Sequence, residues 1–167
     1  MRTSWLNRQT AEGVIGMEKA FYLARWPKIR KGLLTILDEF HDEDLAFTPV
    51  EGGWTTGRIM LHISSAANYW LHSGILSPDN VYRSGESTLE NYPTLDAIRA
   101  YLADEQQRTL SLLEGFDINV WNQPFRYPDG YYYTPGRVFW HVLEHEIHHR
   151  GELSLIMGLL GRDGLDV

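Results

Sequence analysis

Histidine is the residue type in this sequence best suited to metal chemistry, and five of the seven histidines fall in two short stretches. His62 lies in the first stretch, and residues 141–149 hold the other four. Side chains four residues apart in an α-helix share a face, so the rings of His145 and His149 can converge on one ion. The same spacing relates His141 to His145, so spacing alone leaves two candidate pairs.

The apolar face of the expected last helix distinguishes these pairs. At about 100° per residue, His149 falls near the middle of that face and His145 close to its edge. His141 and His148 fall on the opposite flank, so we predict that they lie near the site without binding metal. His62 lies beside an apolar stripe of an earlier helix and can also face the interior. We therefore predict His62, His145 and His149 as metal ligands.

Three histidines on buried faces favour a metal ion over a purely structural role. A single histidine on an apolar face is usually a hydrogen-bonded core residue, but three without carboxylate partners would each need a hydrogen-bond partner. One ion satisfies all three, and a three-nitrogen site leaves a position open for water or substrate, as in catalytic zinc sites. The chain contains no cysteine, which excludes disulfides, thiolate ligands and thiol nucleophiles.

Helical spacing and end signals predict four long helices that position these ligands, and hence an all-α four-helix bundle. Residues 75–93 form a connection too long for a tight turn, which makes it a candidate functional segment. The predicted helices begin or are capped at Pro27, at Thr55 or Thr56, at Thr94 and at Thr134 with Pro135, and they end before Asp42, near Gly74, near Leu113 and at Gly161.

Two segments are less regular than the helices. Residues 125–133 carry an Asp129-Gly130 turn signal between aromatic arms, which predicts a short β-hairpin or an extended loop. Residues 1–25 are predicted as an N-terminal arm, and the pattern of residues 14–24 is compatible with a helix as well as with a segment that wraps across the bundle.

The composition limits the classes of function. The length of 167 residues and the hydrophobic share of 43% fit one globular domain, residues 1–167. A net charge of -7 argues against a nucleic-acid groove, and the basic run from Arg25 to Lys31, which includes Arg30, is predicted as a solvated helix face. No stretch approaches the ~20 apolar residues of a membrane span, and no apolar leader is evident, so we expect no membrane contact and a cytoplasmic location.

Two motifs carry a family resemblance. The segment His141-Val-Leu-Glu-His145-Glu-Ile-His-His149-Arg-Gly-Glu-Leu153 resembles the C-terminal signature of the DinB/YfiT-like superfamily. The segment Trp54-Thr-Thr-Gly-Arg-Ile-Met-Leu-His62-Ile resembles the second-helix motif of the same family. The resemblance spans about Trp26 to Leu160 and places the family's three ligands on His62, His145 and His149. It implies an up-down-down-up bundle, often a homodimer, with a zinc, nickel or similar divalent ion at one end.

The resemblance also implies a class of reaction. Several relatives are transferases or isomerases that use a low-molecular-weight thiol such as bacillithiol, mycothiol or glutathione, and many members have no known activity. We therefore expect a metal-dependent enzyme that activates a thiol or water for transfer to a small electrophilic substrate. A non-catalytic stress-response or small-molecule-binding module with a bound metal is the alternative.

A metallopeptidase is a further alternative, because residues 145–149 match the pattern of two zinc-binding histidines that flank a general base, here Glu146. That class needs another ligand downstream, and no histidine follows His149. This alternative is therefore the weakest of the three.

Other residues are assigned around the expected ion. Trp54, Trp70 and Tyr132 are predicted to line the pocket, although aromatic stripes also occur in plain core packing. Tyr69 is predicted as a catalytic hydrogen-bond donor. Arg150 is predicted either to orient a substrate carboxylate or, in a structural role that we favour, to tie its helix to a partner carboxylate.

Overall fold

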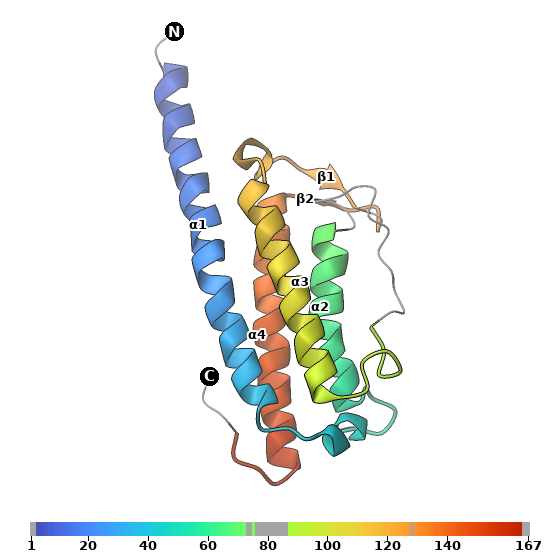
Figure 1. The fold of residues 1–167 in the computed structure, drawn as a ribbon. Coiled ribbons are helices and arrows are strands. Elements are labelled where there is room, and N and C mark those ends of the chain that lie inside the picture. The colour runs from blue at the N-terminus through green and yellow to red at the C-terminus, as the bar shows by residue number, and fades with distance from the viewer. Residues whose placement is uncertain (1–2, 73–74, 76–86, 128, 165–167) are drawn as a thin grey trace.

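The computed structural model describes residues 3–72, 75, 87–127 and 129–164, with side chains described from Glu18 onward. The described residues form four α-helices, two 3₁₀ helices and two short strands (Figure 1). The helices are α1 (Thr3–Leu37), α2 (Thr56–His72), α3 (Leu95–Gly115) and α4 (Pro135–Leu159), the 3₁₀ helices are η1 (Asp42–Ala46) and η2 (Ile118–Val120), and the strands are β1 (Phe125–Arg126) and β2 (Tyr132–Tyr133).

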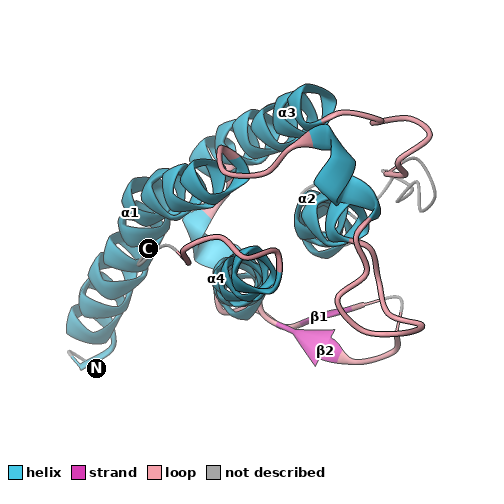
Figure 2. Ribbon diagram, turned by 90° about the horizontal axis from the view of Figure 1, so that it is seen from below, coloured by secondary structure: helices cyan, strands magenta, loops and turns pink. Residues whose placement is uncertain are grey.

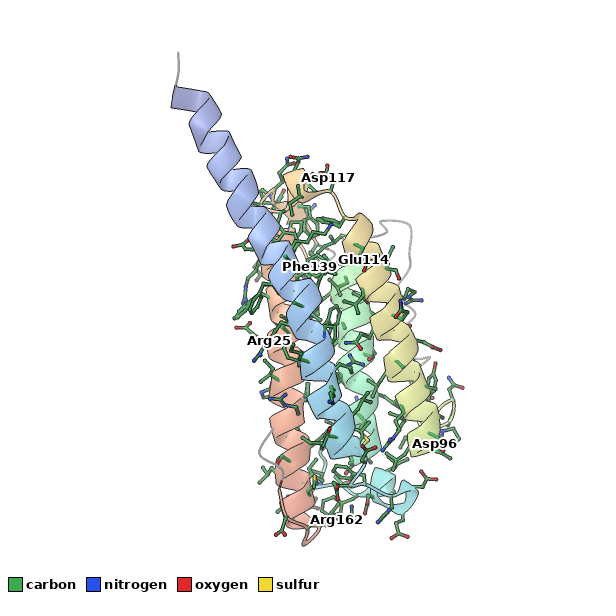
Figure 3. All side chains as sticks on the ribbon, turned by 60° about the vertical axis from the view of Figure 1, so that its left-hand side comes forward. Arg25, Asp96, Glu114, Asp117, Phe139 and Arg162 are labelled. Atoms are coloured by element: carbon green, nitrogen blue, oxygen red, sulfur yellow. The ribbon has the colours of Figure 1, made fainter. Side chains whose placement is uncertain are left out.

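The four helices form a bundle in which α1 and α4 run one way and α2 and α3 run the other (Figure 1). Viewed along the bundle, α1 and α2 each pack between α3 and α4 (Figure 2). Figure 3 shows Asp96, at the start of α3, and Arg162, just after α4, at the same end of the bundle, with Glu114 at the other. The all-α class and the up-down-down-up order are therefore confirmed.

The predicted start of the first helix at Pro27 is wrong, because α1 begins at Thr3 and passes through this proline. Proline removes one backbone hydrogen bond, which a helix survives when neighbouring side chains hold it in place. Pro27 is exposed, whereas Trp26 and Ile29 on either side are only 2% and 4% exposed. Packing against the bundle thus outweighs the local stop signal, and the helical alternative for residues 14–24 is confirmed.

The other helix ends were predicted correctly from capping residues in the sequence. The Thr94 hydroxyl accepts the Ala97 amide at the start of α3, and Thr134 accepts the Arg137 amide at the start of α4. Gly161 follows α4 with a φ of 77°, a left-handed conformation that glycine adopts without strain. These contacts confirm the predicted caps.

The predicted hairpin is also confirmed. Strand β1 pairs antiparallel with β2, with Phe125 opposite Tyr133, and Gly130 supplies the turn with a φ of 89°. The predicted functional connection over residues 75–93 falls largely outside the described residues. No helix in the described part of the chain has the length and apolarity that crossing a bilayer requires.

The core consists of two hydrophobic clusters separated by a polar layer. In α4 the first cluster ends at Leu143 and the second begins at Leu153. Glu146 and His149 are buried between these leucines, and Arg30 and Ser64 are buried at the matching levels of α1 and α2. The polar layer therefore crosses the bundle at about the middle, and the predicted metal ligands belong to it.

Candidate metal centre

His62 from α2 and His145 and His149 from α4 meet at one point. The Nε2 atoms of His145 and His62 are 3.1 Å apart, and those of His149 and His145 are 3.2 Å apart. One ring nitrogen from each of the three lies within 4.8 Å of the others. Two nitrogens that each bind an ion at about 2.0–2.1 Å are about 2.9 Å apart at a right angle and about 3.3 Å apart at a tetrahedral angle. The donor set therefore fits one divalent transition-metal ion.

The backbone explains why these rings meet. His145 and His149 are one helical turn apart on α4, which brings their rings edge-on to each other with centroids 4.4 Å apart. Helix α2 packs antiparallel to α4 and brings His62 to the same level, 83 residues away along the chain. His149 is 8% exposed, and the other two rings are half-buried. The cluster therefore lies at the edge of the core, where one side can admit a small molecule.

The surroundings keep two of these rings neutral. Burial, with smaller contributions from the neighbouring rings of His149 and His62, lowers the pKa of His145 to about 3. Burial is also the main cause that lowers the pKa of His62, with smaller contributions from His149 and Arg58. Because a metal ion binds the neutral imidazole, the protein environment favours the form that can coordinate.

Glu152 supports the cluster from the side. Its Oε2 atom lies 2.6 Å from Nδ1 of His149, which leaves Nε2 of that ring directed at the other histidines. A carboxylate on the far nitrogen fixes the tautomer and orientation of a ligand histidine. The expectation that the cluster lacks carboxylate partners is therefore wrong. The spacing of three residues between His149 and Glu152 on one helix was the signal that sequence reasoning missed.

Glu146 lies in a different environment from the histidine beside it. Its two carboxylate oxygens accept hydrogen bonds from Nε and Nη2 of Arg30 at 2.8 and 2.9 Å, and Oε2 also accepts from the Trp26 indole at 2.8 Å. The side chain is buried and directed toward α1. A carboxylate with both oxygens occupied in this way is not placed to act as the general base of a metallopeptidase, so the geometry does not support that alternative.

The predicted solvent-exposed position of Arg30 is wrong, because this residue is 2% exposed. Besides Glu146, its Nη1 donates to the Leu102 carbonyl at 2.8 Å and to the Ser64 hydroxyl at 3.3 Å. One guanidinium thus connects all four helices at the polar layer. A buried charge is retained only with such partners, and a basic run in the sequence does not reveal them.

The residues predicted next to the ligands have distinct surroundings. The ring of His141 lies edge-on to Trp70 at 4.7 Å and is 6.0 Å from the ring of His145. His148 is exposed, with its ring 4.9 Å from that of His149. Arg150 lies against Gly32 of α1. All three positions lie beside the cluster, and their functional roles remain predictions.

Trp54 borders the cluster directly. Its ring lies edge-on to His62 with centroids 4.7 Å apart, and the Arg58 guanidinium carbon lies 4.3 Å from the centre of the Trp54 ring. Trp54 is 38% exposed, so it covers one side of the histidines while it still faces solvent. This position is the one expected of a pocket wall.

Of the other two predicted pocket residues, Trp70 lies near the end of α2 and Tyr132 lies in strand β2. Trp70 contacts Tyr69, Tyr127 and Tyr133 in an aromatic group under the hairpin. Tyr132 is 68% exposed, so the structure places it away from the predicted pocket wall, and Tyr133 supplies the hairpin ring in the aromatic group. Side chains alternate sides along a strand, and the sequence did not show which of these neighbours faces inward.

Solved structures share this fold. A DinB-like protein from Bacillus cereus ATCC 10987 is 22% identical, with a TM-score of 0.72 over 87% of this chain and 95% of that one. YfiT from Bacillus subtilis is 19% identical, with a TM-score of 0.58 over 84% of this chain and 87% of that one. YfiT is described as a probable metal-dependent hydrolase with an unusual four-helix bundle topology.

No functionally curated protein matches the sequence. The model of the DinB superfamily matches residues 26–153, a range that includes the three clustered histidines, Glu152 and the buried Arg30. The chain therefore belongs to the DinB superfamily.

Proposed function

We propose that His62, His145 and His149 bind one divalent metal ion and that the protein is a metal-dependent enzyme acting on a small molecule. The observation that carries this proposal is the approach of three Nε2 atoms at 3.1 and 3.2 Å, with Glu152 on the outer nitrogen of His149. Three ring nitrogens at one point repel one another unless they share a proton or an ion. An ion satisfies all three at once.

Zinc is the metal we propose, with nickel as the main competitor. Three neutral imidazoles suit both ions, and the site offers no thiolate that would narrow the choice. The description of YfiT as a probable metal-dependent hydrolase supports a metal-dependent role for this fold.

A divalent ion at a three-histidine site lowers the pKa of a bound thiol or water and so supplies an anionic nucleophile near neutral pH. The protein's own groups hold this site in shape. Glu152 orients His149, Trp54 shields His62 from solvent on one side, and the core packing of α2 against α4 sets the distance between the two helices. We propose transfer of a low-molecular-weight thiol or of water to a small electrophile as the reaction, with Tyr69 as a candidate hydrogen-bond donor.

Metal analysis of protein purified without a histidine tag tests the ligand assignment. We expect one divalent ion per chain in the wild type and loss of nearly all metal in His62→Ala, His145→Ala and His149→Ala. His141→Ala is the matched control, because its ring also lies on α4 beside the cluster and should retain the metal. Full metal content in any of the three ligand variants would contradict the assignment.

Absorption spectra of the cobalt-substituted protein test whether the site is catalytic. An ion with an open position should change its visible absorption when a thiol is added, because the thiolate enters the coordination sphere. An unchanged spectrum at millimolar thiol would indicate a closed, structural ion and would support the non-catalytic alternative.

A further inference from the structure

Arg58 occupies a position on α2 that helix stability does not explain. It lies in the first turn of α2, a turn that contains no acidic residue. The amino end of a helix carries a partial positive charge, so a cation in the first turn is unfavourable there. The amide of Arg58 is bonded to the Thr55 hydroxyl, as in a helix cap, but the exposed guanidinium gains nothing from that bond.

The guanidinium of Arg58 is nevertheless held in a defined place. It stacks over the Trp54 ring at 4.3 Å, and the same ring touches His62 at 4.7 Å. Arg58 precedes His62 by four residues, so both side chains project from one face of α2. The Arg58 guanidinium therefore lies on the Trp54 ring beside His62, one of the three clustered histidines.

Among the residues that the structure describes, the ion pairs do not include Arg58. The carboxylate nearest the histidines is that of Glu152, and it is bonded to His149. In a chain with a net charge of -7, a cation that has no carboxylate partner in the described part of the chain and lies beside a candidate metal centre suggests a partner that comes from solution.

We propose that Arg58 binds an anionic group of the substrate and thereby selects carboxylate- or phosphate-bearing molecules for the metal centre. A planar guanidinium binds either group through two parallel hydrogen bonds, and stacking on Trp54 fixes its plane in advance. The substrate's anionic end then lies at the start of α2, and its reactive end faces the three histidines. This inference rests on the proposed function and adds the class of substrate to it.

The test uses two thiols that differ in charge and are alike in chain, 3-mercaptopropionate and its methyl ester. Each is titrated into the cobalt-loaded protein, and its dissociation constant is read from the visible absorption. We expect the wild type to bind the carboxylate thiol about tenfold more tightly than the ester. Arg58→Gln should reduce this preference to less than about twofold, and Arg58→Lys should retain part of it because a lysine keeps the charge without the planar fork.

Arg126→Gln is the matched control, because it removes the same charge from an exposed position in strand β1. This variant should keep the full preference for the carboxylate thiol. Titration of the same proteins with inorganic phosphate shows whether phosphate competes with the carboxylate thiol for binding at Arg58. Equal cobalt content and equal melting temperatures of all variants show that the fold and the centre are unchanged.

The outcomes separate the two proposals. If the wild type binds no cobalt, the proposed function fails and this inference fails with it. If cobalt binds but the two thiols bind equally, or if Arg58→Gln keeps the preference, the metal centre stands and the role of Arg58 is refuted. Loss of preference in Arg126→Gln as well would show a general charge effect and would also refute it.

Discussion

Two polar clusters lie side by side on α4 and differ in how their atoms are satisfied. Glu146 and Arg30 are almost fully buried, and their carboxylate and guanidinium groups are bonded to each other, to Trp26, to Ser64 and to a backbone carbonyl. At the preceding position of the chain, His145 points at two further imidazole nitrogens. The first cluster is complete within the protein, whereas the second is a set of three electron-pair donors that converge on one point.

This difference distinguishes a structural polar group from a functional one. A buried network in which every donor meets an acceptor fixes the packing of the helices and has no capacity left for a ligand. A cluster of three acceptor atoms is stable only with a proton or a cation among them. The same helix therefore serves both purposes, with successive residues on different faces.

The largest effect should come from breaking the buried pair. Glu146→Leu leaves the Arg30 guanidinium buried without its carboxylate, which should lower the free energy of unfolding by about 3–5 kcal/mol. Urea denaturation in the presence of a chelator measures this loss free of any metal contribution. The double variant Arg30→Met with Glu146→Leu should recover much of it, since both charges are then absent. A loss below about 1 kcal/mol in the single variant would show that the network is not structural.

A change beside the histidines should affect metal affinity more than folding. Glu152→Ala removes the carboxylate that orients His149 and should weaken metal binding by about 10- to 100-fold. Glu152→Gln retains an acceptor and should lie between the wild type and the alanine variant. Competition with a chelating dye gives the affinities. The assignment of Glu152 would be wrong if Glu152→Ala matched the wild type.

His72 is an intermediate case, a buried histidine with one hydrogen-bonded nitrogen. Its Nε2 lies 3.4 Å from the Thr109 hydroxyl, its Nδ1 has no hydrogen-bond partner among the residues that the structure describes, and burial lowers its pKa to about 4. In the unfolded chain the pKa of this imidazole is near 6.5, so its contribution to the free energy of unfolding is fully present above that pH. The contribution falls as the pH drops toward 4, and the loss reaches about 2 kcal/mol at pH 5.

The pH dependence of urea denaturation with a chelator present measures the contribution of His72. In His72→Leu the fall between pH 6.5 and pH 4 should be correspondingly smaller, because the native state no longer contains this neutral imidazole. The other histidines contribute equally to both proteins and cancel in the comparison. Identical pH profiles for the two proteins would refute the role assigned to His72.

The smallest change in stability is expected from an exposed arginine–glutamate pair, which has the same residue types as the buried pair of Arg30 and Glu146. Arg137 and Glu144 are 3.2 Å apart, and their side chains are 56% and 47% exposed. Solvent weakens such a pair, so Glu144→Gln should change the free energy of unfolding by about 0.5 kcal/mol or less. Urea denaturation measures this change in the free energy of unfolding. A loss comparable with that of Glu146→Leu would mean that burial is not what separates the two pairs.

Local chemistry made the helix ends and the histidine cluster predictable. Thr94, Thr134 and Gly161 act on backbone groups only a few residues away, and the turn of α4 between His145 and His149 follows from the helical repeat alone. The choice of His62 needed only the apolar stripe of its own helix. Each of these inferences depends on information within about one turn of the residue concerned.

The features that the sequence did not predict depend on contacts with distant parts of the chain. Arg30 is buried because Glu146, 116 residues later, meets it across the bundle. Pro27 lies within α1 because tertiary packing holds the helix on both sides of it. The orientation of Tyr132 depends on the register of two-residue strands, which no periodicity in so short a segment can determine.

The separation of His62 and His145 has a consequence for the unfolded chain. An ion shared by these residues closes a loop of 83 residues. Such a closure restricts the unfolded ensemble in the same way as a covalent bridge, and the entropy involved grows with the logarithm of the loop length. In a sequence without cysteine, the proposed metal tether between α2 and α4 would need no oxidant to form and would not be broken by a reducing agent.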